Sequence, residues 1–330
     1  MIYLAFVPGF SGNQSSLNPV GPGAERIEHD FTLIFWITAT VYFLVIAALV
    51  MSVWRRRHPL ADMPAPQITT DENERGARRS VMAAMIATVA LLFIMLIGSF
   101  TTSHALAKMR SDNPLTIEVY GHQWWWEVRY PNVESYKIVE TANEIHLPAG
   151  VPVRLHGTSR DVIHSFWAPN VQGKRDLMPG YDTDIMMQID KPGNWRGQCA
   201  EFCGLQHAHM SFFMVAESKD DFDKWLSAEA MSAVEPSTPQ TQHGQQIFLT
   251  RQCVMCHTIR GTRAGSHVGP DLTHLASRST IAAGTLPNTA ANLAGWILNA
   301  QSIKPGSRMP PNQMSDSDLQ DLLAYLETLK

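Results

Sequence analysis

Two cysteines, two histidines, a glutamate and a methionine occupy one short segment, Cys199-Ala-Glu-Phe-Cys-Gly-Leu-Gln-His-Ala-His-Met210. Thiolates and thioethers are soft ligands and imidazoles are intermediate, so the segment favours copper or zinc over magnesium or calcium. Two alternatives stay open on these residues alone, a disulfide between Cys199 and Cys203 and half of a structural zinc site. Met210 favours copper, because thioethers suit copper and are not among the usual zinc ligands.

A second chemically active motif reads Cys253-Val-Met-Cys256-His257. The spacing Cys-x-x-Cys-His is the attachment signal for c-type haem, in which both thiols form thioethers and the histidine binds the iron. A redox dithiol or a zinc half-site would use the same cysteines, but a thioredoxin-like dithiol needs an α/β context that is missing here. The four cysteines therefore predict two separate metal or cofactor sites rather than a disulfide framework.

Two long uncharged stretches that precede these motifs predict a membrane anchor. No Asp, Glu, Lys or Arg lies between residues 30 and 55 or from 80 to 107. A membrane-crossing helix needs about 20 apolar residues, and the alternative, a pair of buried helices in a soluble protein, seldom runs uncharged for so long. We therefore expect a transmembrane helical hairpin over 31–107, inserted in the lipid membrane.

Arginines concentrate between the two stretches, at positions 55, 56, 57, 75, 78 and 79. Because arginine near the ends of a span marks the cytoplasmic side, we expect a cytoplasmic loop at about 54–80. An irregular N-terminal arm over 1–30 and everything after Lys108 would then lie outside, in the periplasm or its equivalent. The net charge of −4 gives no basic surface, so we expect no nucleic-acid partner.

The remainder of the chain divides into two outer domains. Short alternating runs between turns predict an antiparallel sandwich or barrel over 108–226, with strands near 116–120, 144–147, 151–155, 184–189 and 210–216. A small, polar, Pro-punctuated stretch predicts a linker over 227–242. Helical patterns at 244–251, 289–299 and 316–329 predict a helical domain over 243–330.

Three stretches together resemble subunit II of the haem–copper cytochrome c oxidases: Gly121-His-Gln-Trp-Trp-Trp126, Asp161-Val-Ile-His164-Ser, and the segment 199–210. The resemblance covers most of residues 25–225 and implies a multidomain membrane protein with a two-helix transmembrane hairpin and a cupredoxin-like antiparallel β-sandwich. It also implies the two-copper centre called CuA. One departure concerns the start of the second span, where residues 73–82 lack the family's Glu, Trp-Thr and Pro pattern; no role is assigned to Glu74.

The resemblance carries a ligand set with it. It implies that two copper ions are bridged by Cys199 and Cys203, that one copper adds His164 and Met210, and that the other adds His207 and the Glu201 carbonyl. The Glu201 side chain would reach a magnesium or manganese ion at the contact with subunit I. His209 is close in sequence but falls outside the motif register, and Asp161 is expected either to support His164 or to cap its loop.

The run of three tryptophans has two interpretations. Aromatic side chains at alternating positions of a strand would fill the sandwich core. The family resemblance instead implies that Trp124 is the surface aromatic through which an electron enters from cytochrome c.

Residues 243–330 resemble class I cytochrome c, an all-α domain. The resemblance makes Met309 the distal ligand opposite His257, with Met255 and Met314 as rivals, and His/Met ligation raises the reduction potential. The Pro270 carbonyl is expected to accept the ring N–H of His257. Phe248 and Tyr325 are expected to pack the first helix of this domain against the last.

Together these expectations describe the electron-entry subunit of a terminal haem–copper oxidase, with a covalently fused cytochrome c. Electrons would pass from an external cytochrome c or another periplasmic donor to haem c, to CuA and to a haem in subunit I, with subunit III also in the complex. Oxygen would be reduced to water on another subunit, coupled to proton translocation. The alternatives are the CuA subunit of a nitric oxide reductase and a stand-alone membrane-tethered electron carrier.

Overall fold

The computed structural model describes residues 12–55, 71–109, 111–112, 114–134 and 137–330. The chain forms two units, one made by residues 26–109 and the other by residues up to 25 together with 110–330.

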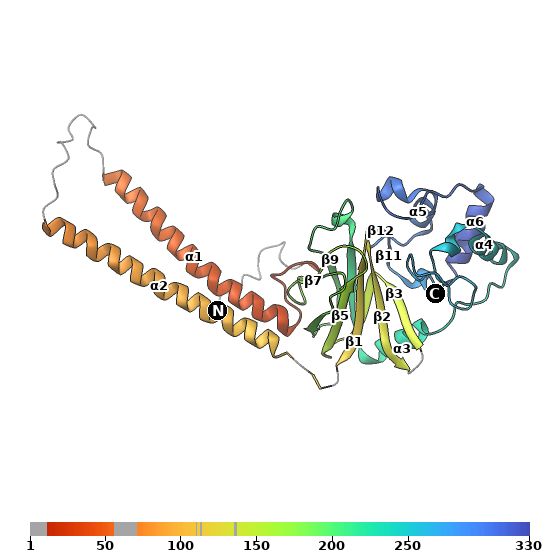
Figure 1. The fold of residues 1–330 in the computed structure, drawn as a ribbon, viewed down its shortest axis with the longest axis horizontal. Coiled ribbons are helices and arrows are strands. Elements are labelled where there is room, and N and C mark those ends of the chain that lie inside the picture. The colour runs from red at the N-terminus through yellow and green to blue at the C-terminus, as the bar shows by residue number, and fades with distance from the viewer. Residues whose placement is uncertain (1–11, 56–70, 110, 113, 135–136) are drawn as a thin grey trace, which may run out of the picture. The chain divides into compact units, whose positions relative to one another are not determined.

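The first unit is a helical hairpin of α1 (Pro22–Arg55) and α2 (Asp71–Ala107) (Figure 1). Both helices are long and apolar enough to cross a membrane. Ser99 Oγ donates a hydrogen bond to Asp30 Oδ2 at 3.0 Å, close to Gly98, where a Cβ would lie 3.2 Å from Leu33 Cδ2. The small residues of α2 therefore let the two helices approach each other.

The hairpin differs from the sequence-based expectation in two places. Helix α2 begins at Asp71, so residues 71–80, which were expected to belong to the cytoplasmic loop, are helical. Helix α1 begins at Pro22, so residues 22–30, which were expected to be irregular, are helical. Proline is well suited to the first helical turn, so the helix can begin at Pro22. The apolar run fixes only the part of the helix that crosses a membrane, and the polar residues before that run extend the helix outside it. Most of the expected cytoplasmic loop, 56–70, lies outside the described residues, as do positions 1–11 of the arm.

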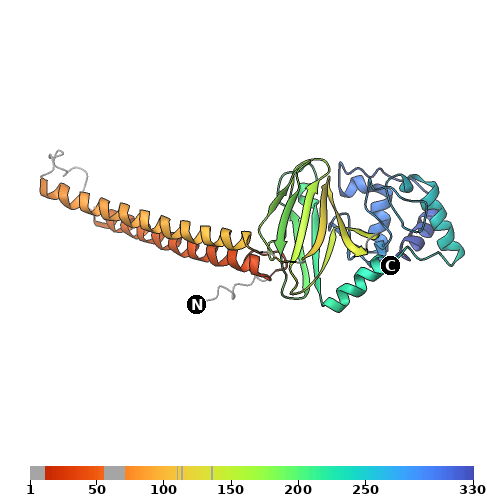
Figure 2. The same ribbon diagram turned by 60° about the horizontal axis from the view of Figure 1, so that its bottom comes forward.

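The second unit begins with two five-stranded sheets packed face to face (Figures 1 and 2). One has the order β3-β2-β1-β5-β8, with bounds Lys137–Ala142, Trp125–Glu134, Leu115–His122, Val153–Ser159 and Thr183–Met187. The other has the order β4-β10-β9-β6-β7, with bounds Glu144–Pro148, Ser211–Glu217, Gly193–Cys199, His164–Trp167 and Arg175–Leu177.

Most neighbouring strands are antiparallel, as expected for a sandwich, but each sheet contains one parallel pair. Strand β5 runs parallel to β1, and β10 runs parallel to β4. The chain passes through the second sheet as β4 before it returns to the first as β5, and this crossover allows β5 to run in the direction of β1. The sandwich with parallel pairs is cupredoxin-like.

An aromatic cluster fills the sandwich beneath the segment 199–210. Trp126, Phe166 and Phe212 are all buried, with ring centroids 5.4 Å apart for Trp126 and Phe212 and 4.3 Å apart for Phe166 and Phe212. Gly197 leaves room for this stack, because a Cβ there would lie 2.1 Å from Phe212 Cζ. Close packing of large rings makes this end of the sandwich a stiff support.

The connection to the helical domain is shorter than predicted. Helix α3 (Lys219–Glu229) runs into the expected linker and α4 (Pro239–Thr250) begins before its end, so residues 230–238 alone separate the two helices. Ser218 and Thr238 cap these helices by accepting hydrogen bonds from backbone N–H groups, which explains where each begins.

The last domain is built around the crossing of α4 with α6 (Asp316–Leu326). Gly244 allows the crossing, because a Cβ there would lie 2.0 Å from the Asp321 carbonyl oxygen. Phe248 and Tyr325 meet at 6.5 Å across it, as expected. Helix α5 (Ala290–Ile303) and the short helices η3 (Gln252–Met255) and η4 (Leu275–Ser277) complete the domain, with a two-stranded ladder of β11 (Thr280–Ile281) and β12 (Leu286–Pro287).

Candidate metal and haem sites

The soft-ligand segment is a loop held at both ends by the second sheet. Cys199 is the last residue of β9, and its N–H donates to the Met210 carbonyl at 2.9 Å, immediately before β10. His164 begins β6, which pairs with β9 through Phe166 and Cys199. The sheet therefore brings His164 to the loop from 35 positions away in the sequence.

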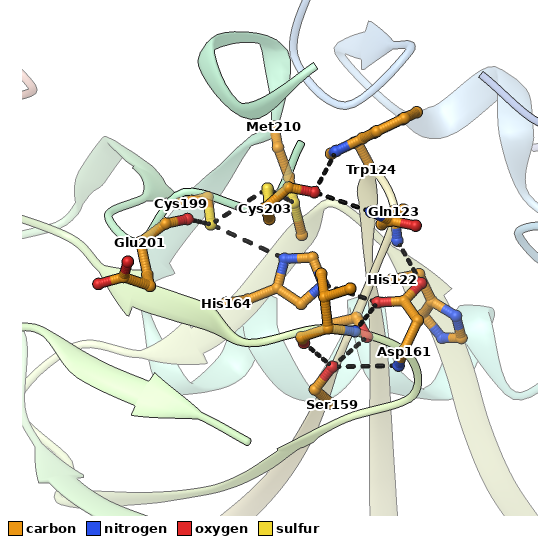
Figure 3. A network of polar contacts seen from close by, with 12 residues as sticks. His122, Gln123, Trp124, Ser159, Asp161, His164, Cys199, Glu201, Cys203 and Met210 are labelled. Carbon is orange, nitrogen blue, oxygen red and sulfur yellow. Dashed lines mark hydrogen bonds and ion pairs between the residues drawn. The ribbon is translucent and has the colours of Figure 1, made fainter. Parts of the chain in front are cut away.

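The side chains and one carbonyl converge on the two sulfur atoms (Figure 3). Cys199 Sγ and Cys203 Sγ lie 3.8 Å apart, well beyond the length of about 2.05 Å of a disulfide bond, and both cysteines are free. His164 Nδ1 lies 3.8 Å and the Glu201 carbonyl oxygen 3.2 Å from Cys199 Sγ. His207 Nδ1 lies 3.6 Å and Met210 Sδ 3.8 Å from Cys203 Sγ.

This donor set fits a soft metal. Within the described residues, the ligand atoms of His164, Cys199 and Cys203 lie within 4.8 Å of one another, and all three residues are buried. Each sulfur has an imidazole nearby, and the Met210 thioether and Glu201 carbonyl complete a mixed set of soft and intermediate donors. The hydrogen bond between the two thiols lowers the pKa of Cys199 to about 3 and raises the pKa of Cys203, because the pair shares one proton; Cys199 is therefore the sulfur that most readily becomes the thiolate that metals bind.

Asp161 orients the imidazole of His164. Asp161 Oδ1 lies 2.9 Å from His164 Nε2, which leaves Nδ1 directed at Cys199. The same carboxylate accepts hydrogen bonds from the N–H groups of Gln123 and Val162, so it both supports His164 and caps its loop. A carboxylate behind a ligand imidazole holds the ring and its tautomer in place.

Two other residues of the loop point elsewhere. The ring of His209 is exposed and lies 2.8 Å from Gln206 Oε1 through Nδ1. The Glu201 side chain is exposed and accepts from the Phe202 N–H at 3.2 Å, so that its carboxylate points away from the sulfur atoms while its carbonyl faces Cys199 (Figure 3).

The three consecutive tryptophans occupy three different settings. Trp126 lies in the core, and Trp125 stacks on His122 with ring centroids 4.4 Å apart. Trp124 is only 9% exposed, and its indole N–H donates to the Cys203 carbonyl at 2.9 Å. Gly204 makes this contact possible, because it has φ of +114° and a Cβ there would lie 3.0 Å from the indole.

The helical domain contains an apolar cavity lined by Cys253, Cys256, His257 and Met309. His257 Nδ1 donates to the Pro270 carbonyl at 2.8 Å, as expected, which leaves Nε2 available to bind iron. Paired thiols, an oriented imidazole and a thioether around an apolar space fit a covalently attached haem. Met314 is not among the residues that line this cavity, and Met255 lines it but is 71% exposed.

Trp124 and Trp125 of the sandwich also line this cavity. Trp124 is therefore a buried residue between the two predicted sites rather than the surface aromatic that the family resemblance implies. Sequence reasoning missed the residues that join the domains here, Gln206, Lys304 and Arg308. Nothing in their local sequence could have found them, since each has a partner at least 95 positions away.

Fold and sites together define a class: an electron-transfer protein in which two apolar helices precede a cupredoxin-like domain with a soft-metal site and a c-type cytochrome domain. Comparison with known proteins agrees with this class. The family model for the periplasmic domain of cytochrome c oxidase subunit II matches residues 115–218, and that for cytochrome c matches residues 241–330.

Relatives cover nearly the whole chain. Cytochrome c oxidase subunit 2 of Alkalihalophilus pseudofirmus is 32% identical over 333 residues, which cover 98% of this chain and 94% of the relative. That of Bacillus subtilis is 26% identical over 338 residues, with 96% and 92% covered. The solved periplasmic domain of subunit II of the Bradyrhizobium japonicum cytochrome oxidase is 28% identical, covers 36% of this chain and 94% of that chain, and has a TM-score of 0.34.

The chain belongs to the cytochrome c oxidase subunit 2 family and carries a C-terminal cytochrome c domain. It is a subunit of a haem–copper oxidase complex and has an electron-transfer role there. Its two domains imply copper and haem c, and the protein is membrane-anchored with periplasmic domains.

Proposed function

We propose that this subunit receives electrons at haem c and delivers them through a CuA centre to a haem of subunit I. There oxygen is reduced to water, coupled to proton translocation. One observation carries the proposal: Trp124 lines the haem cavity with one part of the residue and donates a hydrogen bond to the Cys203 carbonyl with its indole. A single residue therefore contacts both sites.

In this proposal Cys199 and Cys203 would hold two copper ions between them. His164 and Met210 would serve one copper, and His207 and the Glu201 carbonyl would serve the other. When bound, such a copper pair takes up and releases one electron shared over both metals. The protein limits the geometric change that accompanies this exchange, because the buried aromatic stack and the hydrogen bond between Cys199 and Met210 hold the ligand loop stiffly.

Cys253 and Cys256 would attach the haem, and His257 and Met309 would bind its iron. Pro270 fixes the orientation of the His257 ring through the hydrogen bond at 2.8 Å. Ligation by histidine and methionine supplies the high reduction potential that an electron donor to an oxidase needs.

The burial of Trp124 indicates where the external electron donor binds. Trp124 is buried against the cytochrome domain, so an external cytochrome c or other periplasmic donor delivers its electron to the haem domain instead. The exposed apolar side chains of Met255 and Val268, at the border of the haem cavity, mark the entry surface. The exposed carboxylate of Glu201 reaches a magnesium or manganese ion at the contact with subunit I, in a complex that also contains subunit III.

The test is an optical and EPR spectrum of the purified complex, with metal analysis and with oxygen and nitric oxide consumption measured side by side. We expect c-type haem, two coppers per chain in a mixed-valence pair, and turnover of oxygen. Turnover of nitric oxide alone would instead favour a nitric oxide reductase. Purification of the chain without a large haem-containing partner would favour a stand-alone carrier.

A further inference from the structure

Lys304 crosses from the cytochrome domain into the sandwich and is almost fully buried, at 3% exposed. Its Nζ donates hydrogen bonds to three backbone carbonyls: that of Trp124 at 3.0 Å, that of His209 at 2.8 Å and that of Ala282 at 3.1 Å. Two of these carbonyls belong to the sandwich, that of His209 within the ligand loop and that of Trp124 next to it, and the third belongs to the cytochrome domain.

Three carbonyls match the three N–H donors of an ammonium group. Burial lowers the pKa of Lys304 to about 7, and burying a cation is costly unless it is fully hydrogen-bonded. Apolar side chains of similar volume would hold two domains together without this cost. A buried ammonium group is instead suited to specifying one arrangement, because its hydrogen bonds are satisfied only when all three carbonyls are in place.

The residues after Lys304 tie the same two domains together and lead to the haem. The Pro305 carbonyl accepts from Gln206 Nε2 at 2.8 Å, and Arg308 Nη2 lies 3.6 Å from Asp161 Oδ2. Met309, the proposed distal ligand, follows directly. The segment 304–309 therefore links the lining of the haem cavity to both supports of the proposed copper site, the ligand loop and the carboxylate behind His164.

We propose that Lys304 is a positioning residue for intramolecular electron transfer, and that it locks the haem cavity against Trp124 and the ligand loop. The proposal rests on the function proposed above. With the lock closed, electron transfer takes place in one preformed arrangement. Without it, the remaining contacts between the domains hold that arrangement less rigidly, and small misplacements of reacting groups slow a reaction strongly.

The test substitutes Lys304→Met in the complete oxidase, which keeps most of the apolar stem and removes all three donors. After photochemical reduction of the haem, we expect the rate of electron transfer to copper to fall by about tenfold or more and to become dependent on solvent viscosity. The haem and copper spectra should not change. Lys224→Met, on the exposed face of α3, is the matched control and should leave the rate unchanged.

Hydrogen exchange supplies a readout that does not depend on electron transfer. The amide of Ser211 donates to the Ala283 carbonyl at 3.2 Å, and the amide of Ser279 donates to Glu144 Oε1 at 2.8 Å, so both report on the contact between the domains. Both amides should exchange faster in Lys304→Met than in the parent protein. If the parent protein transfers no electron from haem to copper, the proposed function fails, while these amides still test the lock.

An unchanged transfer rate in a Lys304→Met oxidase with full haem and copper content would overturn the positioning role. Unchanged exchange at Ser211 and Ser279 would overturn the lock itself. If Lys304→Met does not assemble, Gln206→Ala removes the hydrogen bond to the Pro305 carbonyl, together with the contact to His209 Nδ1, and should slow transfer by a smaller factor, about threefold. An unchanged rate and unchanged exchange in that variant would count against the proposal in the same way.

Discussion

The indole N–H of Trp124 donates a hydrogen bond to the carbonyl of Cys203, 79 residues away, at 2.9 Å. Gln123 Nε2 donates to the same carbonyl, also at 2.9 Å. These two side-chain hydrogen bonds hold the Cys203 backbone in place (Figure 3). Cys203 is one of the two cysteines proposed to bridge the coppers. Trp124 also lines the cavity at the Cys253–His257 motif, so it contacts both proposed redox sites.

Replacing Trp124 by phenylalanine should slow electron transfer from haem to copper by about tenfold or more, because the variant loses the hydrogen bond and part of the ring that fills the space between the sites. The measurement is the rate after photochemical reduction of the haem, with copper content checked by metal analysis. Trp225→Phe, on α3, should leave the rate unchanged. Equal rates in the parent and Trp124→Phe proteins would remove Trp124 from the path.

His207 and His209 allow a direct test of the ligand register. His207 Nδ1 lies 3.6 Å from Cys203 Sγ, whereas the His209 ring is bonded to Gln206. His207→Ala should lower the copper content or abolish the mixed-valence EPR signal, because the variant lacks the imidazole proposed to bind one of the coppers. His209→Ala should retain both coppers and their signal. Loss of the signal in His209→Ala, with the signal retained in His207→Ala, would make His209 the ligand in place of His207.

Met309 and Met314 separate the distal ligand from its nearest rival. Met309 lines the haem cavity, while Met314 packs against the helical core. Met309→Leu should lower the reduction potential of the haem and alter its optical spectrum, because a thioether ligand to iron is lost. Met314→Leu conserves volume and should leave the potential unchanged. A redox titration of both variants decides the matter, and a drop in potential for Met314→Leu alone would contradict the assignment.

Gly244 and Gly295 form a matched pair for the packing of the cytochrome domain. A Cβ at Gly244 would lie 2.0 Å from the Asp321 carbonyl oxygen, whereas a Cβ at Gly295 meets no atom within 4 Å. Gly244→Ala should destabilise the domain by about 1–3 kcal/mol, because α4 and α6 must move apart. Gly295→Ala should stabilise it by about 0.5–1 kcal/mol through helix propensity. Thermal unfolding followed by haem absorbance would measure both, and equal effects would disprove the close crossing.

His146 should make the stability of the sandwich depend on pH. Although burial opposes its charge, the nearby carboxylates of Glu144 and Glu217 raise the pKa of His146, and its ring stacks on Trp225 at 4.0 Å, near Tyr130. A raised pKa in the folded state adds stability that is complete below the unfolded pKa of about 6.5 and is lost as pH rises through the folded value.

The melting temperature of His146→Gln should therefore fall below that of the parent protein by a few degrees at pH 5 to 6, with the gap closing at higher pH (about 4–8 °C per kcal/mol for a small domain). Melting curves of the detergent-solubilised protein across this range provide the measurement. A gap that stays constant with pH would show that His146 acts through packing alone.

The sequence by itself determined the chemistry and the order of the parts. The types and spacing of Cys199, Cys203 and Met210 predict a soft-metal loop, and the Cys253–His257 motif predicts haem attachment, because both depend on residues that are neighbours in the chain. The prediction of a helical hairpin, a cupredoxin-like sandwich and a cytochrome domain is confirmed. These features follow from the period of the apolar residues and from the Gly and Pro residues between them, because local sequence largely determines which segments form helices, strands and turns.

Only the folded chain decided how the two redox sites meet. The lock at Lys304 joins residues 180 positions apart, and its partners are backbone carbonyls, which every residue carries and no side-chain pattern marks. The burial of Trp124 likewise depends on a domain that lies far along the chain. Local propensity carries no information on such contacts, since they form only after each domain has folded and two surfaces have come together.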